Sequence, residues 1–271
     1  MKAPLVVLFE WHNSSEYDII KIISSDWMGL CMDCSEFYLK IHHNLQENIQ
    51  TSLSSSCYTQ FAGASAFIDD YGLWQKWIAE KYKVEIFSLA LSEYETALLL
   101  ALQSLYKQAF NSLRACLEHT LFGIQLTTNL FQYLNWKQDG QDVYWSEITD
   151  LDSGLFSSRY ISVFFPELDS SSKLILELAK CVYRECSQFT HGNYGAWKTI
   201  KHPPVYSELM FKKFLDEVES IKYITEYAFF VRFIKELPKE KIVDFDSQIR
   251  EYLGHLREVT DYLTFIDEEE K

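Results

Sequence analysis

Apolar residues recur at intervals of three and four along most of this chain, which is the spacing of positions on one face of an α-helix. The clearest run covers residues 91–127. Its apolar positions form one stripe made of Leu98, Leu102, Leu105, Ala109, Leu113, Leu117 and Leu121. A stripe of this length predicts a helical segment that turns one side toward a core.

Other segments show the same spacing less regularly, and the residues between them mark helix ends. Further helices are expected over residues 27–53, 60–83, 205–237 and 245–263. The Ser-rich residues 51–56 predict a loop, and Pro238 ends a helix. Residues 135–166 carry turn signals at 137–140 and 152–154, so they predict an ordered connection with short helical pieces.

One more helix is expected to end at His191-Gly192. The Asp and Ser residues at 169–172 are good N-cap residues, and Gly192 is a natural stop. The apolar stripe between them consists of Leu174, Ile175, Leu178, Val182 and Phe189.

Composition supports an all-α fold. Only 9 Gly and 5 Pro occur in 271 residues, whereas an all-β fold uses turn residues at every strand junction.

The apolar run at residues 5–9 is either a short strand or an arm packed on helices. Three regions are expected: an N-terminal helical region over 1–85, a helical bundle over 86–237, and a packed C-terminal helix with an acidic tail over 238–271.

Aromatic residues make up 16% of the chain and charged residues 24%, a composition that excludes a disordered chain. The net charge of −14 repels phosphate backbones at long range and argues against a broad nucleic-acid-coating surface. One local basic stretch stands out between residues 180 and 202. It holds four cations (Lys180, Arg184, Lys198 and Lys201) against one anion, Glu185, which gives 4 − 1, or +3.

The chain carries no sign of export or of a membrane span. Its N-terminal apolar run is too short for a signal-peptide core, and no stretch approaches the roughly 18 apolar residues that a membrane helix needs. The six Cys lack the short regular spacing of a disulfide framework. A cytoplasmic protein is expected.

Arg184 and His191 are the best candidates for chemistry. Seven residues on a helix turn through 700°, so the two side chains share one face about 10 Å apart along the axis, opposite the apolar stripe. An imidazole can move protons at ribose and leaving-group oxygens while a guanidinium holds the phosphate. The plainer alternative is a solvated Arg and a His near a helix end. Arg250 and His255 have a similar spacing, but an offset of five residues places them about 140° apart, so this pair ranks second.

Arg114 and Glu118 lie four residues apart beside the core positions of the long stripe. Two interpretations are open. They form an ordinary ion pair within a helix, or Glu118 packs beside the face of Arg184 and orients it.

The helix with Leu113-Arg114 and Glu118, followed by Tyr183-Arg-Glu-Cys-Ser-Gln-Phe-Thr-His-Gly192, resembles the HEPN superfamily over residues 91–237. Its signature is an Arg followed by His after four to six residues, here Arg184 and His191. The resemblance implies a helical bundle that dimerises through the motif helices and acts as a metal-independent endoribonuclease in a defence or toxin system. His191 would transfer protons, Arg184 would clamp phosphate and Glu118 would orient Arg184, with RNA as the substrate. The competing interpretation is a non-catalytic accessory subunit that binds a partner protein.

The remaining motifs are weaker evidence for a functional site. Cys31-Met-Asp-Cys34, with His42 and His43 behind it, is either a zinc site or a pair of buried small residues in a helix. His119 and His202 have no spacing partner, and the helical cysteines Cys116, Cys181 and Cys186 are expected to behave as small hydrophobic residues. No Gly-rich phosphate loop, Gly-x-Ser-x-Gly elbow or His-Glu-x-x-His helix occurs, so nucleotide hydrolysis, a serine hydrolase and a zinc protease lose their usual support. No cofactor and no metal are expected.

Overall fold

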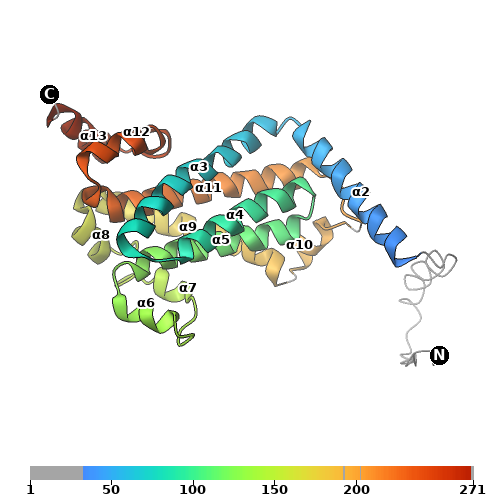
Figure 1. Cartoon of the computed structure of the whole chain (residues 1–271), viewed down its shortest axis with the longest axis horizontal. Coiled ribbons are helices and arrows are strands. Elements are labelled where there is room, and N and C mark those ends of the chain that lie inside the picture. The colour runs from blue at the N-terminus through green and yellow to red at the C-terminus, as the bar shows by residue number, and fades with distance from the viewer. Residues whose placement is uncertain (1–32, 192, 202, 270–271) are drawn as a thin grey trace. The chain divides into compact units, whose positions relative to one another are not determined.

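Every regular element in the described part of the chain is a helix, which confirms the all-α prediction (Figure 1). The computed structural model describes residues 33–191, 193–201 and 203–269, apart from the side chains of residues 196, 197 and 267–269. None of the described helices is both long enough and apolar enough to cross a membrane. The chain divides into two units, residues 1–43 and 44–271, and the helical bundle belongs to the second unit. The apolar run at 5–9 lies outside the described residues.

The α-helices are α2 (Cys34–Leu53), α3 (Tyr58–Tyr82), α4 (Ile86–Leu102), α5 (Tyr106–Leu126), α6 (Leu130–Trp136), α7 (Trp145–Ile148), α8 (Ser158–Phe164), α9 (Asp169–Thr190), α10 (Tyr194–Thr199), α11 (Glu208–Phe233), α12 (Lys239–Leu253) and α13 (Arg257–Glu269). Short 3-10 turns cover Pro166–Leu168 and Ile234–Glu236. The expected helices at 60–83 and 205–237 are therefore confirmed to within a few residues at each end.

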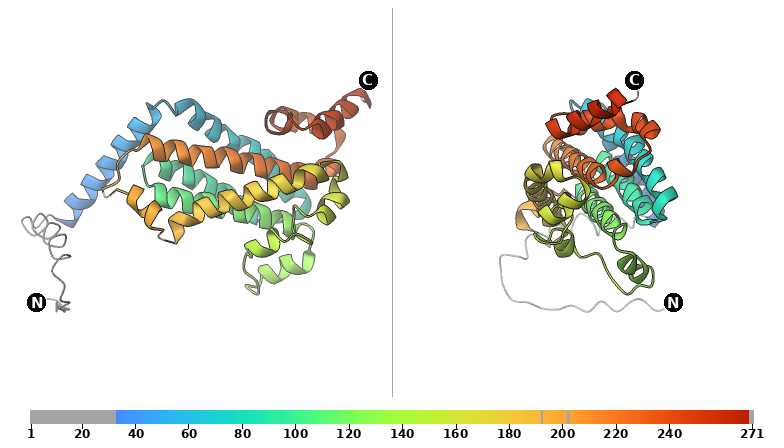
Figure 2. Two further views of the ribbon diagram at one scale, coloured as in Figure 1. Left: turned by 180° about the vertical axis from the view of Figure 1, so that it is seen from behind. Right: turned by 90° about the vertical axis from the view of Figure 1, so that its left-hand side faces the viewer.

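Helix α11 lies at the centre of the bundle, in contact with α3, α4, α5, α9 and α12 (Figure 2). Every residue from 224 to 233 is buried, so this half of α11 faces protein on all sides. Aromatic rings fill much of the space around it: Phe229 contacts the rings of Tyr71, Trp74 and Phe87 at centroid distances of 5.4, 5.6 and 5.8 Å. Much of the aromatic excess of the sequence is thus core, since rings bury a large apolar area.

The long stripe at 91–127 belongs to two helices rather than one continuous segment. The chain reverses after α4, and Gly123, near the end of α5, packs so closely against Ile86 and Phe87 at the start of α4 that an added Cβ would lie 2.8 Å from both. The turn contains no Gly or Pro. Ser104 makes it with a left-handed φ of 62°. Because the three-and-four spacing continues through the turn, periodicity alone could not show the reversal.

The expected helix over 245–263 is likewise two helices, α12 and α13, separated by residues 254–256. The region 135–166 is, as expected, a connection built from short helices, α7 and α8, with α6 just before it. The proposed division at residue 85 stays a prediction. Within the described residues, the buried side chains of α3 and α4 on its two sides belong to the same core.

Candidate functional site

Helix α9 ends at Thr190, with His191 as its C-cap, as the sequence predicts; Gly192 is outside the described residues. The apolar stripe fixes which side of α9 faces the bundle. Ile175, Val182 and Phe189 are buried, and the Phe189 ring stacks on Phe110 of α5 at 4.2 Å and 3°. Leu174 does not belong to this stripe, because it is 69% exposed.

Arg184 and His191 both lie on the exposed side of α9, near its C-terminal end. Among the described residues, neither side chain has a hydrogen-bond or ion-pair partner. The surface between them is polar: Ser187 donates to the Tyr183 carbonyl oxygen at 2.6 Å, and Gln188 donates to Glu185 at 3.0 Å. The structure therefore brings the two predicted residues to one open face with their polar groups available to a ligand.

Glu118 lies on α5, not on the α9 face that carries Arg184 and His191. Its carboxylate accepts from Arg114 at 3.2 Å, and Arg114 also donates to the Tyr183 hydroxyl at 2.7 Å and lies over the Tyr183 ring at 4.4 Å. Trp145 of α7 stacks on the same ring at 4.1 Å. Arg114 and Glu118 thus form an ion pair within α5 that holds α9 through Tyr183, the residue next to Arg184. No contact between Glu118 and Arg184 themselves occurs in the described structure, so the orienting role of Glu118 stays a prediction.

The second Arg–His pair differs from the first because both of its members are engaged within the chain. Arg250 donates to both carboxylate oxygens of Asp246 at 2.8 Å. His255 lies 3.1 Å from the Tyr223 hydroxyl, with its ring 5.3 Å from the Tyr223 ring. This pair is a structural feature of the α12 end and provides a natural control for Arg184 and His191.

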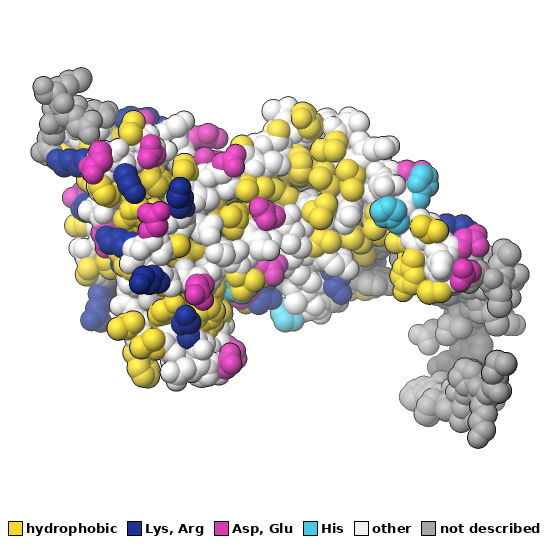
Figure 3. Space-filling view, in the orientation of Figure 1, with side chains coloured by type: hydrophobic (Ala, Val, Ile, Leu, Met, Phe, Trp, Pro, Cys, Tyr) yellow, Lys and Arg dark blue, Asp and Glu magenta, His cyan; other side chains and the backbone are white. Residues whose placement is uncertain are grey.

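The basic stretch around α9 and α10 keeps part of its charge uncompensated. Lys180 is 3.7 Å from Glu177, and Lys198 lies 4.5 Å over the Tyr194 ring. The single anion, Glu185, is held by Lys213 of α11 at 3.0 Å. On the face shown in Figure 3, most of the charged side chains lie on the left part, where acidic and basic groups are interspersed and form no broad basic area.

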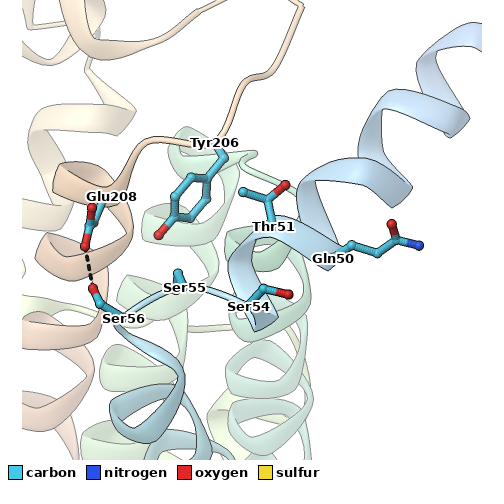
Figure 4. A pocket seen from close by; sticks show the side chains of 7 residues that line it. All are labelled: Gln50, Thr51, Ser54, Ser55, Ser56, Tyr206 and Glu208. Carbon is cyan, nitrogen blue, oxygen red and sulfur yellow. Dashed lines mark hydrogen bonds between the residues drawn. The ribbon is translucent and has the colours of Figure 1, made fainter.

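An open cavity of about 450 Å³ lies between the end of α2 and the start of α11 (Figure 4). Hydroxyl groups line it, and one lining residue, Ser56, donates to another, Glu208. The described lining contains no cation and no imidazole. It therefore suits a neutral polar group better than a phosphate, and it is separate from the α9 face.

A buried carboxylate on α11 gives no signal in the sequence. Glu226 is 0% exposed and accepts from Trp74 Nε1 at 3.0 and 3.1 Å, with Gln248 Nε2 at 3.4 Å. Burial raises its pKa to about 8. In the sequence it stands four residues after Lys222 and looks like half of a surface ion pair. In the structure Lys222 instead pairs with Glu219 at 3.0 Å.

The cysteines and the remaining histidines add no site. Cys34 is exposed and Cys31 lies outside the described residues, and no group of three metal-ligating side chains occurs in the part of the chain described. Cys116 and Cys186 are buried as expected, whereas Cys181 is exposed. Burial lowers the pKa of His119.

Comparison with known proteins gives no relative: no family model, no curated protein and no solved structure matches this chain. The α9 face and its surroundings are therefore the basis for assigning a function.

Proposed function

We propose that this protein is a metal-independent endoribonuclease of HEPN type, with Arg184 as phosphate clamp and His191 as proton-transfer group. One observation carries the proposal. The two side chains share the exposed face at the end of α9, inside the basic stretch, and neither is bound by another described residue. Arg250 and His255, which have a similar spacing, are both engaged.

The chemistry requires more than one helix. In RNA cleavage without a metal, the ribose 2′-oxygen attacks phosphorus and the bond to the 5′-oxygen breaks, leaving a 2′,3′-cyclic phosphate. A base must take the 2′-hydroxyl proton and an acid must protonate the leaving 5′-oxygen. One α9 supplies one exposed imidazole. A two-fold dimer through α9 supplies two, with two guanidinium groups to stabilise the charge that develops on the phosphate.

The test uses the full chain, a short labelled RNA and EDTA in the buffer. We expect cleavage that resists EDTA, leaves 2′,3′-cyclic phosphate ends and stops when the cleaved nucleotide is 2′-deoxy. His191→Ala should slow cleavage about 10²–10⁴-fold, and Arg184→Ala about 10²–10³-fold. Arg250→Ala and His255→Ala are the matched controls and should cleave as the wild type does.

The activity per chain should also rise with protein concentration, because the site forms from two copies. Expression in cells should be harmful for the wild type and harmless for His191→Ala if the protein acts as a toxin or defence nuclease. If wild type and His191→Ala leave a panel of RNAs equally intact, including in the presence of proteins encoded beside this one, the nuclease proposal is refuted.

A second function, as a non-catalytic subunit that binds a protein, is favoured by α6. This helix exposes Leu130 (69%), Phe131 (78%) and Leu134 (48%), and exposed apolar clusters of this kind mark protein contacts. Its test is co-purification with a protein encoded beside this chain. Phe131→Ser should abolish the interaction, whereas Val163→Ser, at a 71% exposed position on α8, should not. Equal binding by both variants would refute it.

A further inference from the structure

Helix α6 projects from the side of the bundle together with α7 (Figure 2). Its outer side carries three large apolar side chains, Leu130, Phe131 and Leu134, which are 69%, 78% and 48% exposed. On a helix these positions lie within about 100° of one another, so they form one continuous apolar surface, which we call the α6 face. Large apolar groups gain free energy when they leave water, so the α6 face is a candidate contact for a second molecule.

The opposite side of α6 is fixed to the rest of the chain. Tyr133 donates to the Lys83 carbonyl oxygen at 2.7 Å, and the Trp136 ring lies 6.4 Å from the ring of Phe122 on α5. The Asn129 side-chain oxygen caps α6 by accepting from the backbone N–H three residues later, at 3.0 Å. These contacts hold the helix in one orientation, so the α6 face is in place before a partner arrives and little ordering opposes binding.

Acidic residues predominate in the chain around α6. Residues 129–153 contain five acids against one base, Lys137, which gives 1 − 5, or −4. The acids are Asp139, Asp142, Glu147, Asp150 and Asp152. Lys137 itself lies 3.7 Å from Glu85. The single positive charge of this segment is thus partly neutralised, and the field around α6 is negative.

Two of these acids can be placed beside α6. Gln132, the neighbour of Phe131, donates through Nε2 to Glu147 Oε2 at 3.3 Å, which brings a carboxylate of α7 to the edge of α6. Glu147 and Asp150 line an open cavity of about 410 Å³, whose described lining contains no Lys, Arg or His. A hydrogen bond from the Ser153 hydroxyl, with others from backbone N–H groups, lowers the pKa of Asp150, so this carboxyl stays charged at neutral pH. An apolar surface and a carboxylate-lined cavity therefore lie next to each other.

We propose that the α6 face binds a basic amphipathic helix of a partner protein. The apolar stripe of that helix lies on the α6 face, and a Lys or Arg at the edge of the stripe enters the cavity of Glu147 and Asp150. Leu130 and Leu134 are one helical turn apart, about 6 Å, which is also the spacing of side chains along one face of a partner helix. The inference rests on the second proposed function, protein binding through α6, and is independent of the nuclease activity.

Charge favours this partner over other occupants of the α6 face. A second copy would bring the same acidic segment and a net charge of −14 against the first. RNA and anionic membranes carry phosphate groups, which the carboxylates repel. A neutral apolar segment gains nothing from the carboxylates, whereas flanking Lys or Arg residues form charge-assisted hydrogen bonds with them and speed association.

Fluorescence anisotropy of labelled synthetic peptides with the full chain tests the proposal. The probe is a helical peptide of about 18 residues with Leu at positions i, i+3, i+4 and i+7 and Lys at the other positions. Three companion peptides replace every Lys by Gln, replace every Lys by Glu, or carry the Leu and Lys residues in scrambled order. We expect the Lys peptide to saturate one site, the Gln and scrambled peptides to bind more weakly, and the Glu peptide not to bind. Raising NaCl from about 50 to about 300 mM should weaken the Lys peptide and leave the Gln peptide nearly unchanged.

Variants locate the binding. Phe131→Ser should weaken the Lys peptide at least about tenfold, because it removes the most exposed ring of the α6 face. Glu147→Gln combined with Asp150→Asn should weaken the Lys peptide about 3–10-fold and leave the Gln peptide unchanged. Two matched controls should bind as the wild type does: Val163→Ser, at a 71% exposed position on α8, and Glu240→Gln, at an exposed position on α12. Helix α12 lies on the opposite side of the bundle from α6 in each view (Figure 1 and Figure 2). An unchanged circular dichroism spectrum shows that each variant is folded.

The proposal is overturned if the Lys peptide binds no more tightly than the Gln or scrambled peptide, or if Phe131→Ser binds it as the wild type does. It is also overturned if Phe131→Ser converts a dimer into a monomer in sedimentation, which assigns the α6 face to a second copy, or if Phe131→Ser abolishes binding to anionic vesicles. A partner that co-purifies through Phe131 although the Lys peptide does not bind leaves the second function standing and refutes only the basic helix. Arg184→Ala and His191→Ala should bind the Lys peptide normally, so a failure of the nuclease proposal leaves this one intact.

Discussion

Replacing Glu226 with Gln should change how the stability of this protein depends on pH. The carboxyl group is completely buried, and its hydrogen bonds come from Trp74 and Gln248. Lys222, four residues earlier on α11, is bound to Glu219. Asp70, on α3, adds repulsion to the charged form. Glutamine has nearly the same shape and keeps an oxygen for Trp74 Nε1, but it cannot ionise.

The size of the effect follows from the pKa of Glu226, which burial raises from 4.5 to about 8 in the folded protein. Between these values the folded state binds the proton more strongly than the unfolded state does. Stability is therefore highest below pH 4.5 and falls as the pH rises toward 8. At about 1.4 kcal/mol per pH unit, the free energy of unfolding should fall by roughly 3 kcal/mol between pH 5 and pH 8 through this one group.

Urea unfolding followed by tryptophan fluorescence at pH 5, 6, 7 and 8 measures the contribution of Glu226 to the free energy of unfolding. Glu226→Gln should be about as stable as the wild type at pH 5 and more stable by roughly 3 kcal/mol at pH 8. Taking the difference removes the contribution of Glu217, whose pKa burial raises to about 7. Glu95→Gln, at an exposed position on α4, is the matched surface control. A pH-independent difference for Glu226→Gln would show that the carboxyl group is not buried as described.

Three further predictions concern single residues elsewhere in the bundle. Gly123→Ala should destabilise the protein by about 1–3 kcal/mol in urea unfolding, because its Cβ would lie 2.8 Å from Ile86 and Phe87; an unchanged midpoint would mean that α4 and α5 are not so close. Burial acts to raise the pKa of Glu236, but hydrogen bonds from Lys81, Tyr82 and Arg232 outweigh it and lower the pKa to about 2. Glu236 therefore stabilises the fold above pH 4.5 and loses this effect as the pH falls toward 2, so wild type should lose more stability than Glu236→Gln in acid unfolding between pH 5 and pH 3. Tyr183→Ala should cost about 3 kcal/mol or more, because it removes the ring between Trp145 and Arg114, whereas Tyr183→Phe should cost only about 1 kcal/mol for the lost hydrogen bond; equal losses in thermal unfolding would contradict the stacking.

Local patterns were enough to predict most helices but not the points where the chain reverses. Of the apolar stripe from Leu98 to Leu121, all positions are buried except Leu102 and Leu105, which lie beside the turn and are only half-buried. The spacing does not show where the chain reverses, and a turn made by Ser104 carries no Gly or Pro signal. Gly254 did stand at the second missed break, between α12 and α13, but it also fits inside a helical pattern.

In the candidate site, too, features within one helix could be predicted from the sequence, whereas contacts between helices could not. The spacing of Arg184 and His191 placed them on one exposed face of α9, because that depends only on helix geometry. The Arg114–Glu118 ion pair lies within one helix, but the bond from Arg114 to Tyr183 of α9 and the bond from Trp74 to Glu226 join helices that are distant in the sequence. No pattern within one helix contains that information.

The central place of α11 has a consequence for how the chain folds during its synthesis. The rings of Tyr71, Trp74 and Phe87 leave the ribosome roughly 140–160 residues before Phe229, the residue that covers them. At about 5–20 residues per second, the sides of α3 and α4 that pack on α11 stay uncovered for roughly 7–30 s. During that interval the nascent chain is a substrate for chaperones, and a message truncated before α11 yields a product that aggregates.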